Sequence, residues 1–423
     1  MSHGHNVRQL QHCALLFRSS FLKAEPFART CNRRYLHQVS SPASVQSTTA
    51  KSTKSTANGS NNSASQASPA STNVSRFTQQ CRPFMTYVHE TATEIMLQPR
   101  VLITGGMGQL GQSMARLFRS KYGRDNVILS DIVKPSRRDL DNVAPYMYID
   151  ILDAQTLSST VVNYQVDWIV HFSAILSAIG ERNVPLALRI NIEGLHNVLE
   201  VAKQHSLRVF VPSTIGAFGP TSPRVMTPDV TVQRPRTIYG VAKVHAELLG
   251  EYYSERFGLD FRSLRFPGII SATQPGGGTT DYAIKIFYDA IQHGHHVCNL
   301  APDTRLPMMY IDDCLRSVVE IMEAPASCLS QRTYNVTAMA FTPAEIAAEI
   351  QKLRPSFRIT YNVDENVQRI ADSWPQSLDD RQAQADWTWR SHFNLQTMTQ
   401  TMIRLLTAPA TEPTTQSLRH VIT

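Results

Sequence analysis

Apolar and polar positions alternate along the chain in a way that predicts both strands and helices. From Gln98 onward, short apolar runs are separated by longer stretches in which apolar residues recur with the helical period. The first run, residues 101–103, is too short for a helix and is bounded by glycine, which indicates a buried strand. Comparable runs predict strands at residues 127–131, 146–150, 166–172, 207–211 and 260–265. This alternation predicts an α/β fold with a doubly wound parallel sheet and helices on both faces.

The first predicted strand leads into a glycine-rich turn. Gly105, Gly108 and Gly111 follow it, and residues 112–118 continue with helical periodicity. In a Rossmann dinucleotide-binding turn, three glycines permit a tight bend, the close approach of a pyrophosphate, and close packing of the helix on the strand. The N–H groups at the start of that helix bind phosphate oxygens. We therefore predict a dinucleotide site here, with Gln109 and Leu110 among its contacts.

The second predicted strand ends in an acid, Asp131. It stands about twenty residues beyond Gly111, where dinucleotide-binding folds carry the carboxylate that accepts from the ribose hydroxyls. A carboxylate there also repels the 2′-phosphate of NADP. Lys134, Arg137 and Arg138 are cations suited to such a phosphate, but they follow later in the chain. The order of these charges favours NAD as the cofactor.

Further cofactor contacts are predicted at the carboxyl ends of later strands. Asp150 ends the third strand, where its carboxylate either accepts from an adenine amino group or caps the following helix, and the sequence favours neither. Small residues after the fourth strand let the chain run beside the cofactor, and the backbone after the sixth strand lies beside the nicotinamide. The other predicted contacts are Ile151, Phe172, Ser173, Ala174, Asn191, Pro267 and Ile269.

A tyrosine and a lysine four residues apart suggest catalysis. Residues 241–253 have helical periodicity, so Tyr239 and Lys243 are predicted to share one helix face. A phenol is a poor base at neutral pH, but a neighbouring ammonium favours the phenolate. Thr214, at the end of the fifth strand, supplies a hydroxyl that orients a substrate oxygen. We predict that Tyr239 takes a proton from a secondary alcohol and that Lys243 also contacts the nicotinamide ribose; an exposed, inactive pair is the alternative.

This ordered set of motifs resembles the extended short-chain dehydrogenase/reductase family, which also includes nucleotide-sugar epimerases and dehydratases. The resemblance covers residues 98–400. Within the family, several segments are similar to the short-chain L-threonine 3-dehydrogenases. These segments are residues 175–181, 212–219, 265–271, 275–282, 370–375 and 379–389. The resemblance implies oxidation of L-threonine to 2-amino-3-oxobutyrate with NAD, in the catabolism of threonine to glycine and acetyl-CoA.

The same resemblance implies a substrate site, partners and a location. In the family, residues that match Ser177, Thr214, Tyr239 and the loop with Gly277, Thr279 and Thr280 meet the amino acid, and the choice between the two threonines stays open. From the residues themselves, the start of the helix predicted at residues 280–292 is a candidate site for the threonine carboxylate, and a plain flexible loop is the alternative. The family implies a homodimer, coupling to a 2-amino-3-oxobutyrate CoA ligase, mitochondria as the location, and no metal. Scattered cysteines without ligand spacing agree with the absence of zinc.

The net charge of +7 comes from the beginning of the chain. Ten of the 41 basic residues and one of the 34 acidic residues lie before residue 90. The remainder of the chain therefore has 31 basic and 33 acidic residues. A basic, amphipathic start without acids is typical of an organelle transit peptide, and the Ser/Thr-rich stretch after it is expected to be disordered. We therefore predict a mitochondrial transit peptide (1–38), a disordered linker (39–97), an NAD-binding Rossmann domain (98–270), a smaller interleaved α/β substrate-binding lobe (271–407) and a flexible tail (408–423). A cytosolic protein with a basic arm is the alternative.

Two other functions remain open at the level of sequence. A nucleotide-sugar 4-epimerase would share the fold and the Thr/Tyr/Lys set, although no uridine-diphosphate signature is visible in the carboxyl half. A non-catalytic NAD-sensing subunit would share the cofactor site, but the retained Tyr239 and Lys243 argue against it.

Overall fold

The structure is a computed structural model that describes residues 98–137, 139–274, 276 and 278–408. The predicted transit peptide and linker, Gly277 and the tail beyond residue 408 therefore lie outside the described residues. Arg138 and Pro275 lie outside them as well.

A parallel sheet forms the centre of the fold. Its seven strands, within the described residues, have the order β10-β6-β5-β4-β1-β2-β3, and every neighbouring pair is parallel. The chain moves outward from β1 to β3, returns to β4 on the other side of β1, and moves outward again to β6. The strands are β1 (Val101–Thr104), β2 (Val127–Asp131), β3 (Tyr146–Tyr148), β4 (Trp168–His171), β5 (Arg208–Thr214), β6 (Asp260–Phe266) and β10 (Thr333–Asn335). The six predicted strands are confirmed, and β10 was not predicted.

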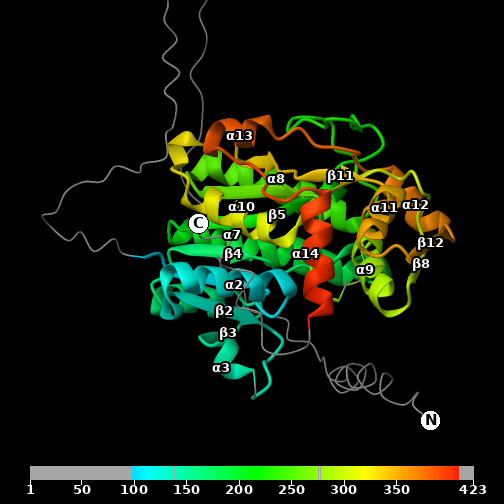
Figure 1. The fold of residues 1–423 in the computed structure, drawn as a ribbon. Coiled ribbons are helices and arrows are strands. Elements are labelled where there is room, and N and C mark those ends of the chain that lie inside the picture. The colour runs from blue at the N-terminus through cyan, green and yellow to red at the C-terminus, as the bar shows by residue number, and fades with distance from the viewer. Residues whose placement is uncertain (1–97, 138, 275, 277, 409–423) are drawn as a thin grey trace, which may run out of the picture. The chain divides into compact units, whose positions relative to one another are not determined.

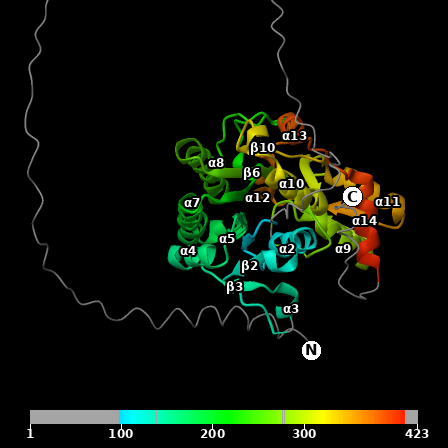
Figure 2. The same cartoon turned by 90° about the vertical axis from the view of Figure 1, so that its left-hand side faces the viewer.

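Helices cover both faces of this sheet, as a parallel sheet requires. One face packs against α2 (Gln109–Tyr122) and α10 (Ile311–Glu323), and the other against α4 (Ala154–Asn163), α7 (Leu195–Gln204) and α8 (Ile238–Phe257). Figure 1 shows the sheet between these layers, and Figure 2 shows α4, α7 and α8 along one side of it. The two faces form separate cores, because Val101 and Ile103 pack into one and Leu102 into the other. The predicted doubly wound fold is confirmed.

The carboxyl half adds two small sheets and a group of helices. The strands β7 and β9 pair parallel and β9 and β11 antiparallel, while β8 pairs with β12. These strands are β7 (Gly268–Ile270), β8 (His295–Cys298), β9 (Leu306–Tyr310), β11 (Met339–Phe341) and β12 (Arg358–Tyr361). The helices are α9 (Tyr282–Gln292), α11 (Pro343–Leu353), α12 (Glu365–Asp372), α13 (Arg381–Trp387) and α14 (Leu395–Thr407). Of these, α9, α11, α12 and α14 group together on the right of Figure 1.

Shorter helical segments complete the described chain. They are α3 (Leu140–Val143), α5 (Ser177–Arg182), α6 (Val184–Leu188), η1 (Arg124–Asn126), η2 (Arg189–Gly194), η3 (Ile215–Ala217) and η4 (Ala326–Cys328). The segment η2 is a π-helical turn, and it joins α6 to α7 without a break. Asn191 lies inside this turn. None of the described helices combines the length and the apolar character needed to cross a bilayer.

Candidate active site

A cavity of about 410 Å³ lies at the carboxyl ends of the central strands. The glycine turn after β1 and Thr214 at the end of β5 both border it, so it spans the point where the strand order reverses. Ligands of open α/β sheets bind at this switch point. The turn glycines Gly105 and Gly111 line it, and so do thirteen other predicted site residues. They are Gly108, Gln109, Leu110, Phe172, Ala174, Ser177, Thr214, Tyr239, Lys243, Pro267, Ile269, Thr279 and Thr280.

Two glycines, Gly105 and Gly111, leave no room for a side chain. A Cβ on Gly105 would lie 2.6 Å from the backbone nitrogen of Ser173, and a Cβ on Gly111 would lie 2.5 Å from the carbonyl oxygen of Gly105. Gly105 also has a positive φ of 66°, which favours glycine. Gly108 is the N-cap residue of α2 and provides no side-chain cap, and the first turn of the helix carries no acid. Its N–H groups and dipole are therefore left for an anion, which fits the pyrophosphate of NAD.

Asp131 is held beside this turn by two backbone groups. Its Oδ2 accepts from the N–H of Met107 at 3.0 Å, and its Oδ1 accepts from the N–H of Val133 at 3.0 Å. Each carboxylate oxygen can accept more than one hydrogen bond, so this arrangement leaves capacity for two ribose hydroxyls. The side chain does not line the cavity. The position fits NAD, and the ribose contact of Asp131 stays a prediction.

Asp150 and Ile151 lie outside the cavity. The Oδ1 of Asp150 accepts from the N–H of Leu152 at 2.9 Å and closes a local turn. The cap of α4 is Asp153, whose side chain accepts from the N–H of Thr156. The helix-cap alternative for Asp150 is therefore wrong, whereas its adenine contact stays a prediction. Ile151 is buried and packs against Gly194, so its side chain belongs to the core.

Asn191 holds the loop that borders the cofactor side of the cavity. Its Oδ1 accepts from the N–H of Ile175 at 2.7 Å, and its Nδ2 donates to the carbonyl of the same residue at 2.9 Å. This pair of hydrogen bonds fixes the chain between Ser173 and Ser177. In the structure the Asn191 amide therefore positions the loop, and a direct cofactor contact stays a prediction.

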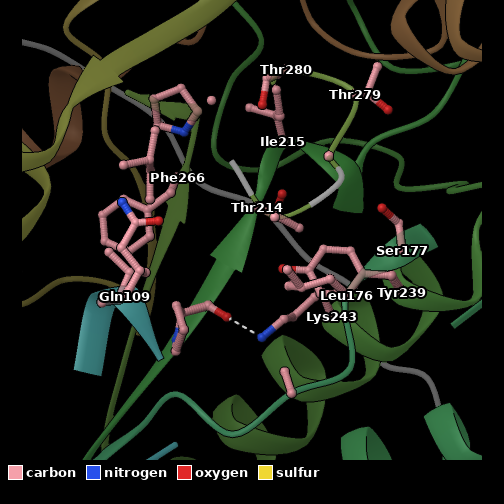
Figure 3. A pocket seen from close by; sticks show the side chains of 18 of the residues that line it. Gln109, Leu176, Ser177, Thr214, Ile215, Tyr239, Lys243, Phe266, Thr279 and Thr280 are labelled. Carbon is pink, nitrogen blue, oxygen red and sulfur yellow. Dashed lines mark hydrogen bonds between the residues drawn. The ribbon is translucent and has the colours of Figure 1, made fainter. Parts of the chain in front are cut away.

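Tyr239 and Lys243 lie on one face of α8 near its start, and both face the cavity (Figure 3). The Nζ of Lys243 lies 5.6 Å from the centre of the Tyr239 ring and donates to the carbonyl of Pro212 at 2.7 Å. Burial raises the pKa of Tyr239 to about 12 and lowers the pKa of Lys243 to about 8. The ammonium alone was expected to favour the phenolate, but burial outweighs it in this structure. The reactive combination of phenolate and ammonium is therefore a minor state at neutral pH.

His171, the last residue of β4, lies near Lys243 and stays neutral. The Nδ1 of His171 lies 2.8 Å from the Oγ1 of Thr104. Burial, with a smaller effect of the Lys243 charge, lowers the pKa of His171 to about 3. His171 therefore carries no charge under physiological conditions and adds no second cation beside Lys243.

Hydroxyl groups surround the space next to Tyr239. Ser177 and Thr214 lie on the same side of the cavity as the phenol, while Thr279 and Thr280 enter from the loop before α9 (Figure 3). Thr279 and Thr280 both line the cavity, and Gly277 lies outside the described residues. The helix α9 begins at Tyr282 rather than at Thr280.

Asp281 is a lining residue that the sequence reasoning missed. With Lys243 it supplies the charged side chains among the described residues that line the cavity. Its Oδ2 accepts from the N–H of Gly278 at 2.8 Å, and the residue occupies the cap position of α9. A carboxylate here makes this helix start less suitable for a substrate carboxylate, and it is complementary to an ammonium. The available signal was its place in the first turn of the helix predicted at residues 280–292, directly after Thr280.

Apolar walls also come from residues that sequence reasoning did not assign to the site. Leu176, Ile215 and Trp374 line the cavity, and Trp374 packs with Ile215 in a small core. Trp374 follows α12, far along the chain from Tyr239, and no local pattern predicts that it reaches the site. Its occurrence in one of the segments with family resemblance was the only signal for it.

The fold and the site together define an NAD-binding oxidoreductase of the short-chain dehydrogenase type. The glycine turn and the Tyr/Lys pair line one cavity at the switch point, and the carboxylate at the end of β2 is hydrogen-bonded to that turn. Residues 101–337 match the NAD dependent epimerase/dehydratase family, and the chain belongs to this family.

Relatives with a named activity share most of the described chain. The mitochondrial L-threonine 3-dehydrogenase of Sus scrofa is 62% identical over 316 residues, which are 74% of this chain and 84% of the pig protein. That of Bos taurus is 59% identical over 322 residues, covering 76% and 86%. The crystal structure of L-threonine dehydrogenase from Phytophthora infestans aligns with a TM-score of 0.70 at 49% identity, covering 73% of this chain and 98% of that one.

Proposed function

We propose that this chain is an NAD-dependent L-threonine 3-dehydrogenase, which oxidises the 3-hydroxyl of L-threonine to the ketone of 2-amino-3-oxobutyrate. The observation that carries the proposal is the single cavity in which Thr214, Tyr239 and Lys243 face a glycine turn suited to a pyrophosphate. The names of the pig, cattle and Phytophthora relatives support the choice of threonine.

Four residues of the chain carry the proposed proton transfer. Thr214 hydrogen-bonds the 3-hydroxyl and orients it, and the Tyr239 phenolate accepts its proton as the C3–H bond breaks. Lys243 stabilises the phenolate through its charge, and Pro212 holds the ammonium in place. NAD, when bound, accepts the two electrons and the hydrogen of that bond as a hydride. The glycine turn, Asp131 and the loop after β4 would hold it.

The remaining groups of the cavity suit an amino acid. Asp281 offers a negative charge to the α-ammonium, while Ser177, Thr279 and Thr280 offer hydroxyl donors to the α-carboxylate. Ile215 and Trp374 form an apolar wall that suits the threonine methyl group. A nucleotide sugar has no ammonium, and it carries a pyrophosphate in addition to that of NAD. This part of the cavity suits such a substrate less well.

The direct test measures NADH formation at 340 nm with NAD and L-threonine. Turnover with L-threonine and none with UDP-galactose is the expected result. Interconversion of UDP-sugars without net NADH would instead support the epimerase alternative. NAD binding without turnover of any candidate alcohol would support the NAD-sensing alternative.

The outer face of α6 and α8 supports the proposed homodimer. Leu188 on α6 and Val241, Leu248 and Tyr252 on α8 are 40%, 46%, 59% and 52% exposed. The three positions on α8 recur at helical spacing, so they form one apolar stripe that a second copy would cover. The experiment measures the molar mass in solution by light scattering, and Leu248→Glu should convert a dimer to a monomer. A wild-type chain that is monomeric at micromolar concentration would refute the proposal.

The mitochondrial matrix is the proposed location, and coupling to a 2-amino-3-oxobutyrate CoA ligase is the proposed context. The acid-poor, basic start of the chain and the word mitochondrial in the relatives' names support the location. The ligase would use CoA to convert the product to glycine and acetyl-CoA. Import of a reporter fused to residues 1–97 into isolated mitochondria, with protection from added protease, tests the location. A reporter that stays outside would refute it.

A further inference from the structure

Behind the Tyr/Lys pair, α8 continues its inner face with a buried carboxylate. Tyr239, Lys243 and Glu247 follow one another at a spacing of four, which places them along one side of the helix. Lys243 is 7% exposed and Glu247 is 1% exposed. The carboxylate lies one turn further from the cavity than the ammonium and does not line it.

Four donors hold this carboxylate. Its Oε1 accepts from the hydroxyl of Ser213 and from the Nε of Arg265 at 2.9 Å. Its Oε2 accepts from a terminal nitrogen of Arg265 at 2.8 Å and from the Nε2 of Gln233 at 2.7 Å. An ionised carboxylate accepts all four, whereas a protonated one would have to donate and lose a partner. Glu247 is therefore held as a fixed, charged group.

The network joins α8 to the two strand ends that border the cavity. Ser213 directly precedes Thr214 on β5, and Arg265 lies on β6 beside it, because Ser213 and Arg265 are paired in register. The carbonyl of Pro212, one residue earlier on β5, holds the ammonium of Lys243. The same strand end therefore contacts both Lys243 and Glu247, and it carries Thr214.

We propose that Glu247 is a positioning residue for this reaction: its fixed carboxylate keeps Lys243 charged and ties the strand end that carries Thr214 to the Tyr239 face of α8. The inference rests on the proposed dehydrogenase function. Burial acts against the charge of Lys243, and Glu247 is the neighbour that opposes this effect.

Other titratable groups around the pair do not replace this carboxylate. From β4, Lys243 faces His171, which is neutral. On the far side of Arg265 lies Asp229, whose backbone carbonyl accepts from the guanidinium and whose pKa burial raises to about 6. Glu251, the next residue along this side of α8, has its pKa raised by burial and lies toward Arg265. Among the described residues, burial and the charge of Glu247 shift the pKa of Lys243, and these two acids do not contribute.

The consequence for catalysis follows from the two titrations. Below the pKa of Lys243, the population with both phenolate and ammonium rises about tenfold for each pH unit, and above it the gain in phenolate is cancelled by the loss of ammonium. The rate should therefore rise with pH and level off near the Lys243 pKa. Removing the carboxylate lowers that pKa, so the levelling point moves to lower pH and the plateau falls by the same factor.

The experiment measures kcat/KM for L-threonine at saturating NAD from pH 6 to 9.5. Glu247→Gln should move the levelling point down by about one pH unit and lower the plateau about tenfold, with misplacement of Thr214 adding to the loss. Glu247→Asp keeps the charge and should restore the levelling point even where turnover stays reduced. Glu255→Gln, an exposed position further along α8, should match the wild type. The substrate ammonium titrates identically in every variant.

A stability control keeps the test decisive. Removing one partner of a buried ion pair leaves the other uncompensated, so Glu247→Gln will melt at lower temperature. If it does not fold, the double variant Glu247→Gln/Arg265→Met removes both charges, and it should still level off below the wild-type pH. A folded variant without the carboxylate that keeps the wild-type levelling point would overturn the proposal. Absence of threonine turnover in the wild type would instead refute the proposed function.

Discussion

Two glycines of the same turn are expected to respond differently to a single added methyl group. In Gly111→Ala, the new Cβ would lie 2.5 Å from the carbonyl oxygen of Gly105 and 2.7 Å from the Cα of Gly106. Both contacts are with backbone, so α2 must move away from β1. In Gly108→Ala, the nearest atom beyond the adjoining residues would be the Gly105 oxygen at 3.2 Å, and among the described residues no other such atom comes within 4 Å. This methyl group would project into the cavity where the pyrophosphate is expected.

The magnitudes differ accordingly. Overpacking of this kind costs about 1–3 kcal/mol, against which a helical alanine regains about 0.5–1 kcal/mol over glycine. The net cost is up to about 2.5 kcal/mol, so Gly111→Ala should lower the melting temperature by up to about 10 °C. Gly108 has a φ of −70°, which alanine adopts without strain, so Gly108→Ala should change the free energy of unfolding by only about 0.5 kcal/mol. Its affinity for NAD should nevertheless fall about 10- to 100-fold, which corresponds to about 1.4–2.8 kcal/mol.

Calorimetric titration with NAD and thermal unfolding with and without NAD separate the two effects. The wild type should gain stability as NAD is raised above its dissociation constant, whereas Gly108→Ala should melt near the wild-type temperature and gain little. Gly111→Ala should lose both stability and affinity. Wild-type NAD affinity in Gly108→Ala would refute the assignment of this turn to the pyrophosphate.

Three further substitutions test the reactive groups and the choice of cofactor. Tyr239→Phe should lower kcat by about 10²–10⁴-fold with NAD affinity retained, because it removes only the phenol oxygen that accepts the substrate proton. Substantial turnover would rule out this base. Lys243→Met should also remove most turnover and abolish the levelling of the pH profile near the Lys243 pKa of about 8, and a rate that still levels there would contradict its role. Asp131→Ala should weaken NAD about tenfold and improve the relative use of NADP; an unchanged NAD/NADP ratio would argue against the ribose contact.

The central sheet was predictable because each of its first six strands carries a local signal. Val101 to Ile103 form an uninterrupted apolar run, as a strand covered on both faces requires, and a glycine turn follows directly. The spacing of Tyr239 and Lys243 likewise needs only the helical period. Features of this kind are encoded within a few neighbouring residues, and the structure confirms the elements that carry them.

Contacts between distant segments were not predictable in the same way. Trp374 reaches the cavity because the chain after it pairs with the segment around Thr227. The N–H of Thr227 donates to the carbonyl of Ser377 at 3.0 Å, and the N–H of Asp379 donates to the carbonyl of Thr227 at 2.9 Å. Neither segment has the alternation of a strand, so periodicity gives no sign of the pairing. The strand β10 was also missed. It has only three residues, and it pairs with β6 from a distant part of the chain.

Polar residues near the cofactor site presented a different difficulty. Asp131 and Asn191 were predicted to contact the cofactor, and Asp150 either to contact it or to cap a helix. In the structure the Asn191 amide is hydrogen-bonded to the backbone of Ile175, and Asp150 closes a turn. A sequence shows that a carboxylate or amide is near a strand end, but it does not show whether a backbone N–H reaches that group first. The distinction depends on loop geometry, which residue types alone do not specify.

In the proposed mechanism, the reactivity of Tyr239 and Lys243 depends more on their surroundings than on their spacing. An exposed pair at the same spacing would keep ordinary pKa values and would be surrounded by water. Burial strengthens the interaction between phenolate and ammonium by lowering the local dielectric, but it also favours the neutral form of each group. The carbonyl of Pro212 and the carboxylate of Glu247 oppose the second effect at Lys243. In the proposed mechanism, reactivity thus depends on polar groups behind β5 and α8, whose arrangement arises only when the strands and the helix pack together.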